Sequence, residues 1–581
     1  MIPKKYVPNF LKPIIRQARF WLKPNWGMIQ MINERDDLIE QYKAVIKNTK
    51  NIKKNINSKK ILFVSGYGIG TSYITIEPII MLSLIARGHS VENVYCDNAL
   101  SSCEFNPVGN NYPKAESEYL QGITSRAINE KCNFCKGNVE AINNLLKIPL
   151  HSLTTFLDSD NYDTSLNYIS NFYQREKKYT SYCYDDINIG EDAYASILRV
   201  TYRGEIPDGE LGESLKKRYL ISSIQSVIAY KKLFSMIKPD RIVCIHGIYQ
   251  THGLVVKVAK KLGIPVIVIG GGGIRKDTVL ACHGETYHHQ LINEDNSIWL
   301  KNQFNNVIES KVIDYANKKR HSGSSVDYLN YHPNPQNNVE MICNELNIDR
   351  DRPIVSIYTN VIWDAQILYK SNAFENIYDW VRTTIELLEN QDIWLLVRVH
   401  PAEVKGGNPS NQKMEDELKK IFPILPRNVR IVPPESDISS YMLAEMSILN
   451  IIYGTKMGLE IALMKKPVMV CGESFSRNKG YCIDIDNKNE YSEYLKDILN
   501  KNFEHDIQSN YELAVRYAYY LYFQKMIDMP FSSDNQMDAG SGKKLNFSGL
   551  DDLLDKEKMG GLNSLCNGII NLEPLHHDQL Y

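Results

Sequence analysis

One stretch of twenty residues, 451–470 (IIYGTKMGLEIALMKKPVMV), constrains the fold more than any other. An apolar segment over 446–452 runs into a turn of small residues and then into a short helix that carries Glu460, and a second apolar segment follows at 467–471. Uninterrupted apolar strands joined through a helix are typical of parallel sheets that are covered on both faces. The stretch therefore predicts a strand–helix–strand unit of an α/β sheet.

The turn within this stretch is also a candidate binding site. Its glycines, Gly454 and Gly458, let a ligand approach the backbone, and the N–H groups at the start of the helix favour an anion, with Thr455 and Lys456 beside them. Glu460, one turn into the helix, is placed to accept hydrogen bonds from two sugar hydroxyls. The pattern predicts a site for a phosphate and a ribose, and the alternative is an ordinary turn followed by a solvated glutamate.

Two further polar side chains lie at the end of the strand predicted at 392–399 (DIWLLVRV). They are Arg398 and His400, and both can donate hydrogen bonds to an anion. In open α/β sheets, ligands bind at the edge formed by the carboxyl ends of the strands. We therefore expect Arg398 and His400 to lie beside the Gly454 turn.

Length and composition indicate a globular protein with two domains. A chain of 581 residues is too long for one hydrophobic core and suits two α/β domains with extensions. The formal net charge of -1 gives no sign of a nucleic-acid partner. The 11 cysteines are mostly scattered singly, and neither a secretory signal nor a long apolar run is present, which predicts a cytoplasmic location without a membrane-spanning segment.

Composition shifts along the chain predict six parts. These are a basic N-terminal helical extension (1–57), a first Rossmann-like domain (58–320) with an insertion (98–190), a linker (321–350), a second Rossmann-like domain (351–505), an amphipathic helix (506–531) and a polar, loosely ordered tail (532–581). Residues 4–23 mix cations with large apolar side chains, which suits contact with an anionic membrane surface. Packing of this segment on the protein body is the alternative.

The first domain opens with an apolar strand over 58–65 and a glycine turn formed by Gly66, Gly68 and Gly70. An apolar helix and a second strand follow, as in a doubly wound domain. The glycine spacing is GxGxG and differs from the GxGxxG of dinucleotide sites, so no nicotinamide cofactor is predicted. A loop that approaches a substrate phosphate and a plain tight turn are both consistent with this spacing.

No metal site is predicted. Cys132 and Cys135 form the only CxxC motif, and a structural zinc would need two more ligands, for which the sequence has neither a second CxxC nor a CxxH. Asp-x-Asp pairs begin at Asp158, Asp349 and Asp484, but none lies convincingly at the end of a predicted strand.

Residues 238–273 read as a strand ending in His246, a helix and a further strand, and with this unit the chain resembles glycosyltransferases of the two-domain GT-B type. This resemblance implies that the helix at 506–531 is a bracing helix that crosses back to the first domain. The ordered motifs RxHP (398–401), DISSYM (437–442), GxxxGxE (454–460) and KPVMVCGESF (466–475) resemble more narrowly the bacterial capsule polysaccharide biosynthesis family, which includes transferases of the acidic sugar Kdo. The resemblance covers residues 235–490 and, more weakly, 58–97. The chain departs from the family pattern at 453–455, where paired serines are more usual, and in the insertion at 98–190.

The resemblance implies transfer of a sugar from a nucleotide-activated donor, without an obligatory metal or other cofactor. A CMP-linked donor and a surface polysaccharide, glycan or lipid-linked glycan acceptor are implied first. The RxHP and DISSYM motifs also resemble teichoic-acid-type polyol-phosphate transferases, which use CDP-linked donors. In either case Arg398, His400 and the Gly454 turn with Lys456 would stabilise the leaving nucleotide, and Glu460 would hold its ribose.

A transferase of this kind also needs a general base, which the first domain would supply across the domain interface. His246 at its strand end, His252 shortly after it and Glu205 are the candidates, although a histidine at a strand end is often only structural. An epimerase of the same shape and a non-catalytic scaffold on a membrane surface remain alternatives. Product analysis without an acceptor separates the first from a transferase, and the second would bind no nucleotide.

Overall fold

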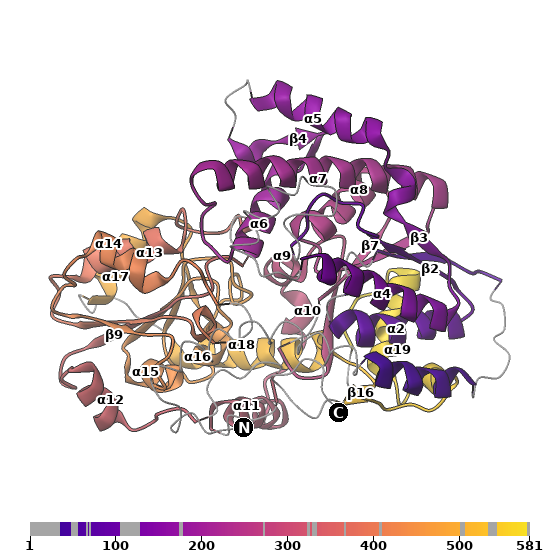
Figure 1. The fold of residues 1–581 in the computed structure, drawn as a ribbon. Coiled ribbons are helices and arrows are strands. Elements are labelled where there is room, and N and C mark those ends of the chain that lie inside the picture. The colour runs from indigo at the N-terminus through magenta and orange to yellow at the C-terminus, as the bar shows by residue number, and fades with distance from the viewer. Residues whose placement is uncertain are drawn as a thin grey trace, which may run out of the picture.

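A computed structural model places the chain in two α/β domains (Figure 1). The structure describes residues 35–47, 56–64, 68, 71–104, 128–173, 178–270, 274–321, 326–327, 334–364, 368–405, 409–499, 506–532 and 543–577. The basic stretch 4–23, Gly66 and Gly70 lie outside these residues.

The first domain is built on a sheet of seven strands in the order β15-β8-β7-β6-β1-β2-β3. The five neighbouring strands β7, β6, β1, β2 and β3 are parallel to one another. At one edge β8 pairs antiparallel with β7, and β15 pairs antiparallel with β8. The strands are β1 (Lys60–Val64), β2 (Ser90–Tyr95), β3 (Leu150–Ser152), β6 (Arg241–Ile245), β7 (Val266–Gly270), β8 (Thr278–His283) and β15 (Ile527–Asp528).

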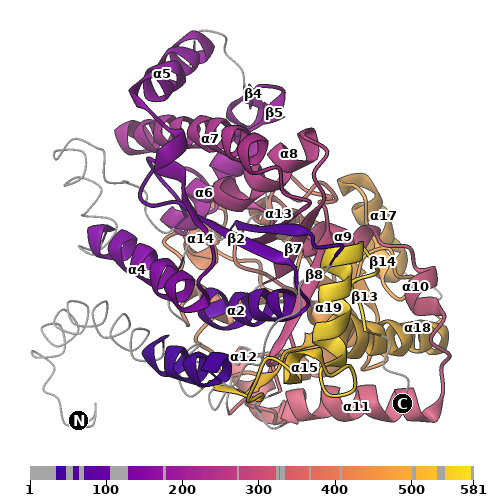
Figure 2. The same cartoon turned by 90° about the vertical axis from the view of Figure 1, so that its right-hand side faces the viewer.

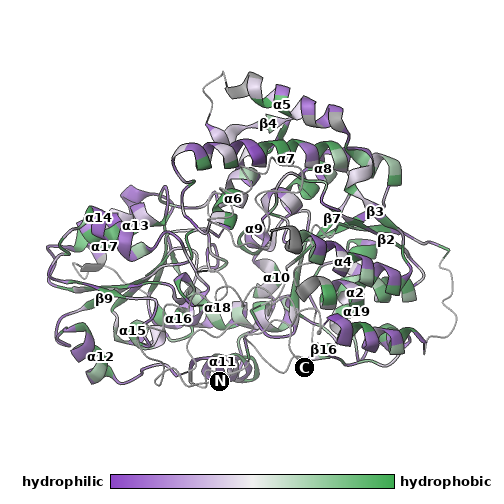
Figure 3. Cartoon of the chain, viewed as in Figure 1, coloured by the Kyte–Doolittle hydropathy of each residue, from purple (hydrophilic) through white to green (hydrophobic). Residues whose placement is uncertain are grey.

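Helices cover both faces of this sheet because its central strands are apolar on both sides. In β1, Leu62 and Val64 belong to one hydrophobic core and Ile61 and Phe63 to another. The first core holds α6 (Gly190–Thr201), α7 (Gly209–Ile237) and α8 (Leu254–Lys261), with α5 (Ser159–Tyr173) packed on α7, and the second holds α2 (Thr71–Ala86), α4 (Ile128–Leu146) and α19 (Gly560–Asn571). Strand β7, whose sequence is VIVIG, is green in Figure 3, whereas α7 carries both colours.

The stretch 98–190 differs from the simple insertion that was expected. It supplies β3, which extends the parallel sheet beside β2, and α4, which packs on α2. A short hairpin of β4 (Cys183–Tyr184) and β5 (Ile187–Asn188) completes it. Weak periodicity hid β3, because this strand has three residues and is only partly buried.

Residues 543–577 also differ from the polar, loosely ordered tail that was expected over 532–581. Here α19 packs against α2, β6 and β15 (Figures 1 and 2). Its residues Leu562, Leu565 and Cys566 are fully or almost fully buried. A small sheet of β16 (Phe531–Ser532) and β17 (Lys544–Leu545) leads into this region. The segment is therefore an integral part of the first domain.

The second domain has a fully parallel sheet of six strands in the order β11-β10-β9-β12-β13-β14. The strands are β9 (Ile354–Tyr358), β10 (Trp394–Arg398), β11 (Val429–Val432), β12 (Leu449–Ile452), β13 (Val468–Val470) and β14 (Ile483–Asp484). Numbered along the chain, this order is 3-2-1-4-5-6, the doubly wound order of dinucleotide-binding folds. The predicted fold class of two Rossmann-like domains is confirmed.

Two groups of helices cover the second sheet. One face carries α13 (Ile377–Leu388), α14 (Met414–Ile421) and α17 (Lys488–Leu499), and the other carries α12 (Val339–Leu346), α15 (Ser440–Met446), α16 (Met457–Ala462) and α18 (Ile507–Tyr519). The connecting helices α9 (Tyr287–Asn293), α10 (Ser297–Leu300) and α11 (Asn306–His321) share the core of this second face, although the sequence placed them in the first domain. After α18 the chain returns to the first sheet as β15. Within the described residues, no helix combines the length and apolar character needed to cross a membrane.

Candidate functional site

The switch points of the two sheets decide where a ligand site is expected. In each sheet the direction in which successive strands are added reverses at one place. This switch point lies between β1 and β6 in the first domain and between β9 and β12 in the second. A crevice at the carboxyl ends of such strands is the usual ligand site of open α/β sheets. The residues that follow β6 and β9 contact one another here, so the two switch points meet at the domain interface.

The turn after β6 brings His246 and Tyr249 to this interface. His246, Gly247 and Tyr249 all have left-handed backbone conformations, with φ of 66°, 71° and 65°. Such conformations cost non-glycine residues free energy and are found disproportionately at functional sites. A buried carboxylate, Glu104, braces the turn because it accepts hydrogen bonds from Thr251 N (3.1 Å) and Thr251 Oγ1 (2.7 Å).

Aromatic and imidazole rings extend from this turn across the interface. The His246 ring lies 5.7 Å from that of Tyr249 and 6.0 Å from that of His288, between ring centroids. His288 in turn lies 5.4 Å from the ring of Tyr369, which belongs to the second domain. We call His246, Tyr249, His288, Tyr369 and the nearby carboxylate of Asp364 the interface cluster.

Asp364 is the charged member of the interface cluster contributed by the second domain. Tyr249 donates a hydrogen bond to its Oδ1 (2.9 Å), and Arg199 Nη1 lies 3.5 Å from the same oxygen. The Arg199 guanidinium stacks 4.5 Å above the ring centre of Trp363, which fixes its position. The side chain of Asp364 remains 51% exposed, so the carboxylate is accessible to a ligand.

Burial and charge set the protonation states of the interface cluster. Burial lowers the pKa of His246 below its ordinary value, although Asp364 opposes this effect, and burial lowers the pKa of His288 to about 3. Asp364 is half exposed, and its partial desolvation opposes the charge, but the Arg199 cation and the Tyr249 hydrogen bond outweigh this effect and lower the pKa of the carboxyl. At neutral pH the cluster therefore holds uncharged imidazoles beside an ionised carboxylate, an arrangement that can accept a proton.

A second contact across the interface joins His289 and Glu473. His289 Nε2 lies 3.3 Å from Glu473 Oε1, and the backbone N–H of Ser371 donates to Glu473 Oε2 (3.2 Å). Glu473 follows β13, so it also lies at the carboxyl edge of the second sheet. A Cβ added at Gly454 would lie 3.3 Å from the Glu473 carbonyl oxygen, so the glycine turn packs closely against this segment.

Glu460, predicted to hold a ribose, is instead committed to protein partners. It forms an ion pair with Lys319 of α11 and accepts a hydrogen bond from Tyr441 (2.9 Å). Lys319 Nζ also lies 2.7 Å from Asp327 Oδ2, to which Lys456 Nζ donates (3.0 Å). We call Lys319, Asp327, Lys456 and Glu460 the buried charge network.

The buried charge network holds two positive and two negative groups. The side chains of Lys319, Asp327 and Glu460 are at most 10% exposed, and that of Lys456 is 37% exposed. Burial opposes the charge on Lys319, but Glu460, Tyr441 and Asp327 outweigh it and raise the pKa of the ammonium. In this structure the cation of the Gly454 turn is thus neutralised by a linker residue.

Arg398 and His400, the other predicted phosphate contacts, also have structural partners. Arg398 is 2% exposed and donates to the carbonyl oxygens of Pro433 (2.6 Å) and Ser436 (3.1 Å), and burial lowers its pKa to about 10. His400 Nδ1 accepts from the N–H of Ala402 (3.1 Å), which caps the turn after β10. Both residues lie at the predicted strand end, but Arg398 fixes the loop before DISSYM and does not point freely into a site.

Gly458 and Gly68 also serve packing. A Cβ at Gly458 would lie 2.6 Å from Ile452 Cδ1, and one at Gly68 would lie 2.4 Å from the carbonyl oxygen of Cys135. Cys135 Sγ accepts from the N–H of Gly68 (2.9 Å), and burial raises the pKa of this thiol to about 12. Gly68 therefore allows close approach of α4.

The two other candidate bases lie outside the interface cluster. His252 is 1% exposed, and burial lowers its pKa to about 3. Glu205 is exposed in the loop before α7. Among the described residues, no group of three or more His, Cys, Asp and Glu side chains is arranged to hold a metal ion.

Sequence reasoning missed Asp364, Tyr249, Tyr369 and Glu473 as members of the site. Asp364 follows β9 by six positions and Glu473 follows β13 by three, so their positions after apolar strands were a usable signal. Tyr249 and Tyr369 gave no such signal in a chain with 36 tyrosines.

The chain matches no protein-family model, and a search of curated proteins found no match. Solved structures do match it. A beta Kdo 2,4 transferase, KpsC of Thermosulfurimonas dismutans, is 13% identical and matches 48% of this chain and 79% of its own, with a TM-score of 0.30. The UDP-GlcNAc 2-epimerase of Neisseria meningitidis, solved with UDP-GlcNAc, is 11% identical over 80% of this chain and 98% of its own, with a TM-score of 0.27. A glycosyltransferase of Rickettsia africae is 12% identical over 80% of this chain and 93% of its own, also with a TM-score of 0.27. The structures similar to this chain thus include glycosyltransferases, Kdo transferases among them, and UDP-GlcNAc epimerases, while the two-domain α/β fold itself is established by the strand orders of the two sheets.

Proposed function

We propose that the protein is a glycosyltransferase that moves a sugar from a nucleotide-activated donor to a glycan acceptor at the interface cluster. The observation that carries the proposal is the hydrogen bond from Tyr249 to Asp364, which joins the turn after β6 to the loop after β9. Through this contact the carboxyl edges of two doubly wound sheets share one site, so a donor on one domain would meet an acceptor on the other.

In this proposal His246 is the general base. Its imidazole is partly exposed and uncharged at neutral pH, so it can accept the proton of an acceptor hydroxyl as that oxygen attacks the donor sugar. The ionised Asp364 would then stabilise the imidazolium that forms. Tyr249 and Arg199 hold the carboxylate in place for this role.

The donor would bind at the carboxyl edge of the second sheet, near the Gly454 turn and Glu473. Arg398 and Glu460 would support this site through the loop and the network that they hold, which replaces the direct contacts expected from the sequence. A CMP-linked donor is proposed on the motif resemblance to capsule polysaccharide transferases, and a CDP-linked donor is the alternative. The proposed acceptor is a surface polysaccharide or a lipid-linked glycan, and residues 4–23 would bring the enzyme to the inner face of the membrane.

The test measures nucleotide release from CMP-, CDP-, UDP- and GDP-linked sugars, with and without a glycan acceptor. Thermal-shift titrations with the free nucleotides CMP, CDP, UDP, GDP and ADP first identify which nucleobase the donor carries. A ligand at a hundred times its Kd adds about 2.7 kcal/mol to the stability of the protein, which is readily detected. We expect acceptor-dependent release of one nucleotide. Conversion of the donor without an acceptor would favour an epimerase, and no response to any nucleotide would favour a scaffold.

Two variants test the roles in the interface cluster. His246→Gln and Asp364→Asn are each expected to lower kcat by roughly 100-fold to 10,000-fold, the usual contribution of general base catalysis, while the Kd of the nucleotide stays unchanged. His151→Gln is the matched control, because His151 lies on β3 and pairs with Glu92. Wild-type turnover by His246→Gln would refute the assignment of the base.

A further inference from the structure

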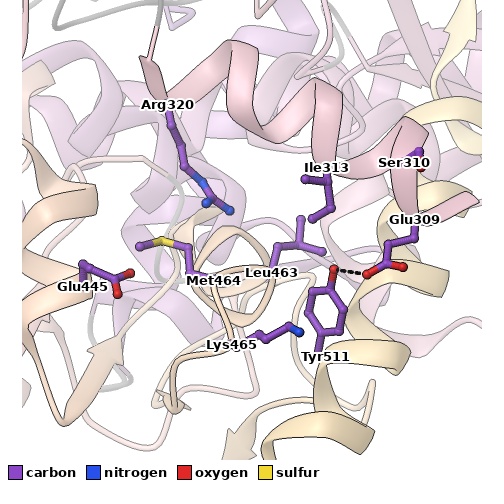
Figure 4. A pocket seen from close by; sticks show the side chains of 9 residues that line it. All are labelled: Glu309, Ser310, Ile313, Arg320, Glu445, Leu463, Met464, Lys465 and Tyr511. Carbon is purple, nitrogen blue, oxygen red and sulfur yellow. Dashed lines mark hydrogen bonds between the residues drawn. The ribbon is translucent and has the colours of Figure 1, made fainter. Parts of the chain in front are cut away.

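A pocket lies on the second domain, and none of its lining residues belongs to the interface cluster. Figure 4 shows the side chains that line it. It has a volume of about 440 Å³ and lies between α11, the turn from α16 to β13, and α18. Its lining residues are Glu309, Ser310, Ile313, Arg320, Glu445, Leu463, Met464, Lys465 and Tyr511. Glu445 precedes β12 and Lys465 precedes β13, so the pocket lies at the amino edge of the sheet, opposite the Gly454 turn.

The charged groups of this pocket are unequally satisfied. Glu309 accepts a hydrogen bond from Tyr511 (2.7 Å), as Figure 4 shows, and Glu445 Oε1 lies 3.5 Å from Lys466 Nζ. Arg320, in contrast, has two buried nitrogens, Nε and Nη2, without a hydrogen-bond partner in the described part of the chain. A buried donor without an acceptor is unfavourable, and a charged one more so, which makes a bound acceptor the expected partner of these two nitrogens.

The identity of the two unpartnered atoms indicates what would bind there. Nε and Nη2 lie on the same edge of the guanidinium, and this edge donates two parallel hydrogen bonds to a carboxylate or a phosphate. Lys465 adds a second cation to the pocket, and its Nζ lies 4.3 Å above the centre of the Tyr511 ring. The apolar side chains of Ile313, Leu463 and Met464 line the same space, which is large for an inorganic anion and within the range of small-molecule sites.

We propose that this pocket binds a small organic ligand through a phosphate or carboxylate held by Arg320 Nε and Nη2. The cation of Lys465 supports the anion, and the body of the ligand lies against the apolar wall. The inference does not depend on the proposed transferase activity, because the pocket and the interface cluster lie at opposite edges of the second sheet.

The test is calorimetric titration of the full chain with three probes that share one ring: glucose 1-phosphate, glucuronate and glucose. We expect one or both anions to bind and neutral glucose not to bind. The two anionic probes distinguish a phosphate from a carboxylate ligand. No heat from either anion at about 10 mM, where a site with a Kd of 1 mM would be mostly filled, would overturn the proposal.

Arg320→Met locates the site. It is expected to weaken binding of the anion at least tenfold, whereas Lys318→Gln, a control on the same helix whose side chain pairs with Asp314 on the surface, leaves binding unchanged. Without ligand, Arg320→Met is expected to unfold at the same temperature as wild type or above it, because it removes donors that lack acceptors. Equal affinity of Arg320→Met and wild type, or a lower unfolding temperature of the variant, would refute the assignment.

Discussion

Replacement of Glu460 by glutamine removes one of the two negative charges from the buried charge network. Tyr441 can still donate to the amide oxygen, so the main loss is the attraction between Lys319 and the carboxylate. Breaking a buried ion pair from one side costs about 3–5 kcal/mol, because the remaining charge stays buried without compensation. Since the side chains of both Lys319 and Glu460 are at most 10% exposed, we expect a loss in this range.

The assay is thermal unfolding of Glu460→Gln, Lys319→Met and the double variant, followed by nucleotide titration of each. A loss of about 3 kcal/mol corresponds to roughly 6–12 °C for domains of this size. We expect the double variant to be more stable than the sum of the single losses predicts, by about 0.5–3 kcal/mol, because it restores charge balance. If Glu460→Gln unfolds like wild type and loses only nucleotide affinity, the carboxylate is a ligand contact and the structural role assigned to it is wrong.

Three further predictions concern stability and the interface. Glu403 is 5% exposed and burial raises its pKa to about 7, so the stability that its protonated carboxyl contributes is fully present below about pH 4.5 and is lost as the pH rises through 7. Glu403→Gln keeps an acceptor for Met414 N, and we expect it to be about 3 kcal/mol more stable than wild type at pH 8 and equally stable at pH 4. A variant with the stability of wild type at both pH values would contradict this. Leu565→Ala is expected to lower the free energy of unfolding by denaturant by about 2–5 kcal/mol, because Leu565 is fully buried. Leu554→Ala is the control, since Leu554 is 40% exposed and should lose less. Equal losses in the two variants would show that 543–577 is not part of the core. Tyr249→Phe removes the hydrogen bond to ionised Asp364, so the pKa of that carboxyl is expected to rise. An NMR titration of the Asp364 carboxyl measures this pKa, and an unchanged value would show that Tyr249 does not stabilise the carboxylate.

The sheets could be predicted from the sequence because their strands are apolar and local. Segments such as 451–470 and 58–97 carry the strand, turn and helix within a short span, and the structure has β12, α16 and β13 in the first and β1, α2 and β2 in the second. The strand end at Arg398 was predicted correctly for the same reason. Periodicity reports which side chains are buried in a local element, and that information was sufficient for the fold class.

The roles of individual polar residues could not be predicted in this way because their partners are distant in sequence. Lys319, which pairs with Glu460, belongs to a connecting helix far earlier in the chain, and the carbonyl oxygens that bind Arg398 belong to the loop at 433–436. A motif specifies that a charge is present at a strand end, whereas the tertiary structure decides whether that charge meets a ligand or the protein itself. His246 follows β6 with a left-handed backbone, and its ring lies 5.7 Å from that of Tyr249, which donates a hydrogen bond to Asp364 of the second domain.

The return of the chain to the first domain through β15 and α19 has a consequence for folding during synthesis. During synthesis β1 is made about 500 residues before α19, but the core that contains Ile61 and Phe63 also contains Leu562 and Leu565, so this side of the sheet stays open until α19 has been made. The second domain has its six strands consecutive between residues 354 and 484 and can close its sheet first. Contacts between such distant segments form slowly and leave apolar surface open to aggregation in the meantime. The first domain therefore starts to be made before the second domain but completes its core after it. Until α19 packs, the apolar face formed by α2 and β1 stays exposed, and a chaperone would be needed most at this face.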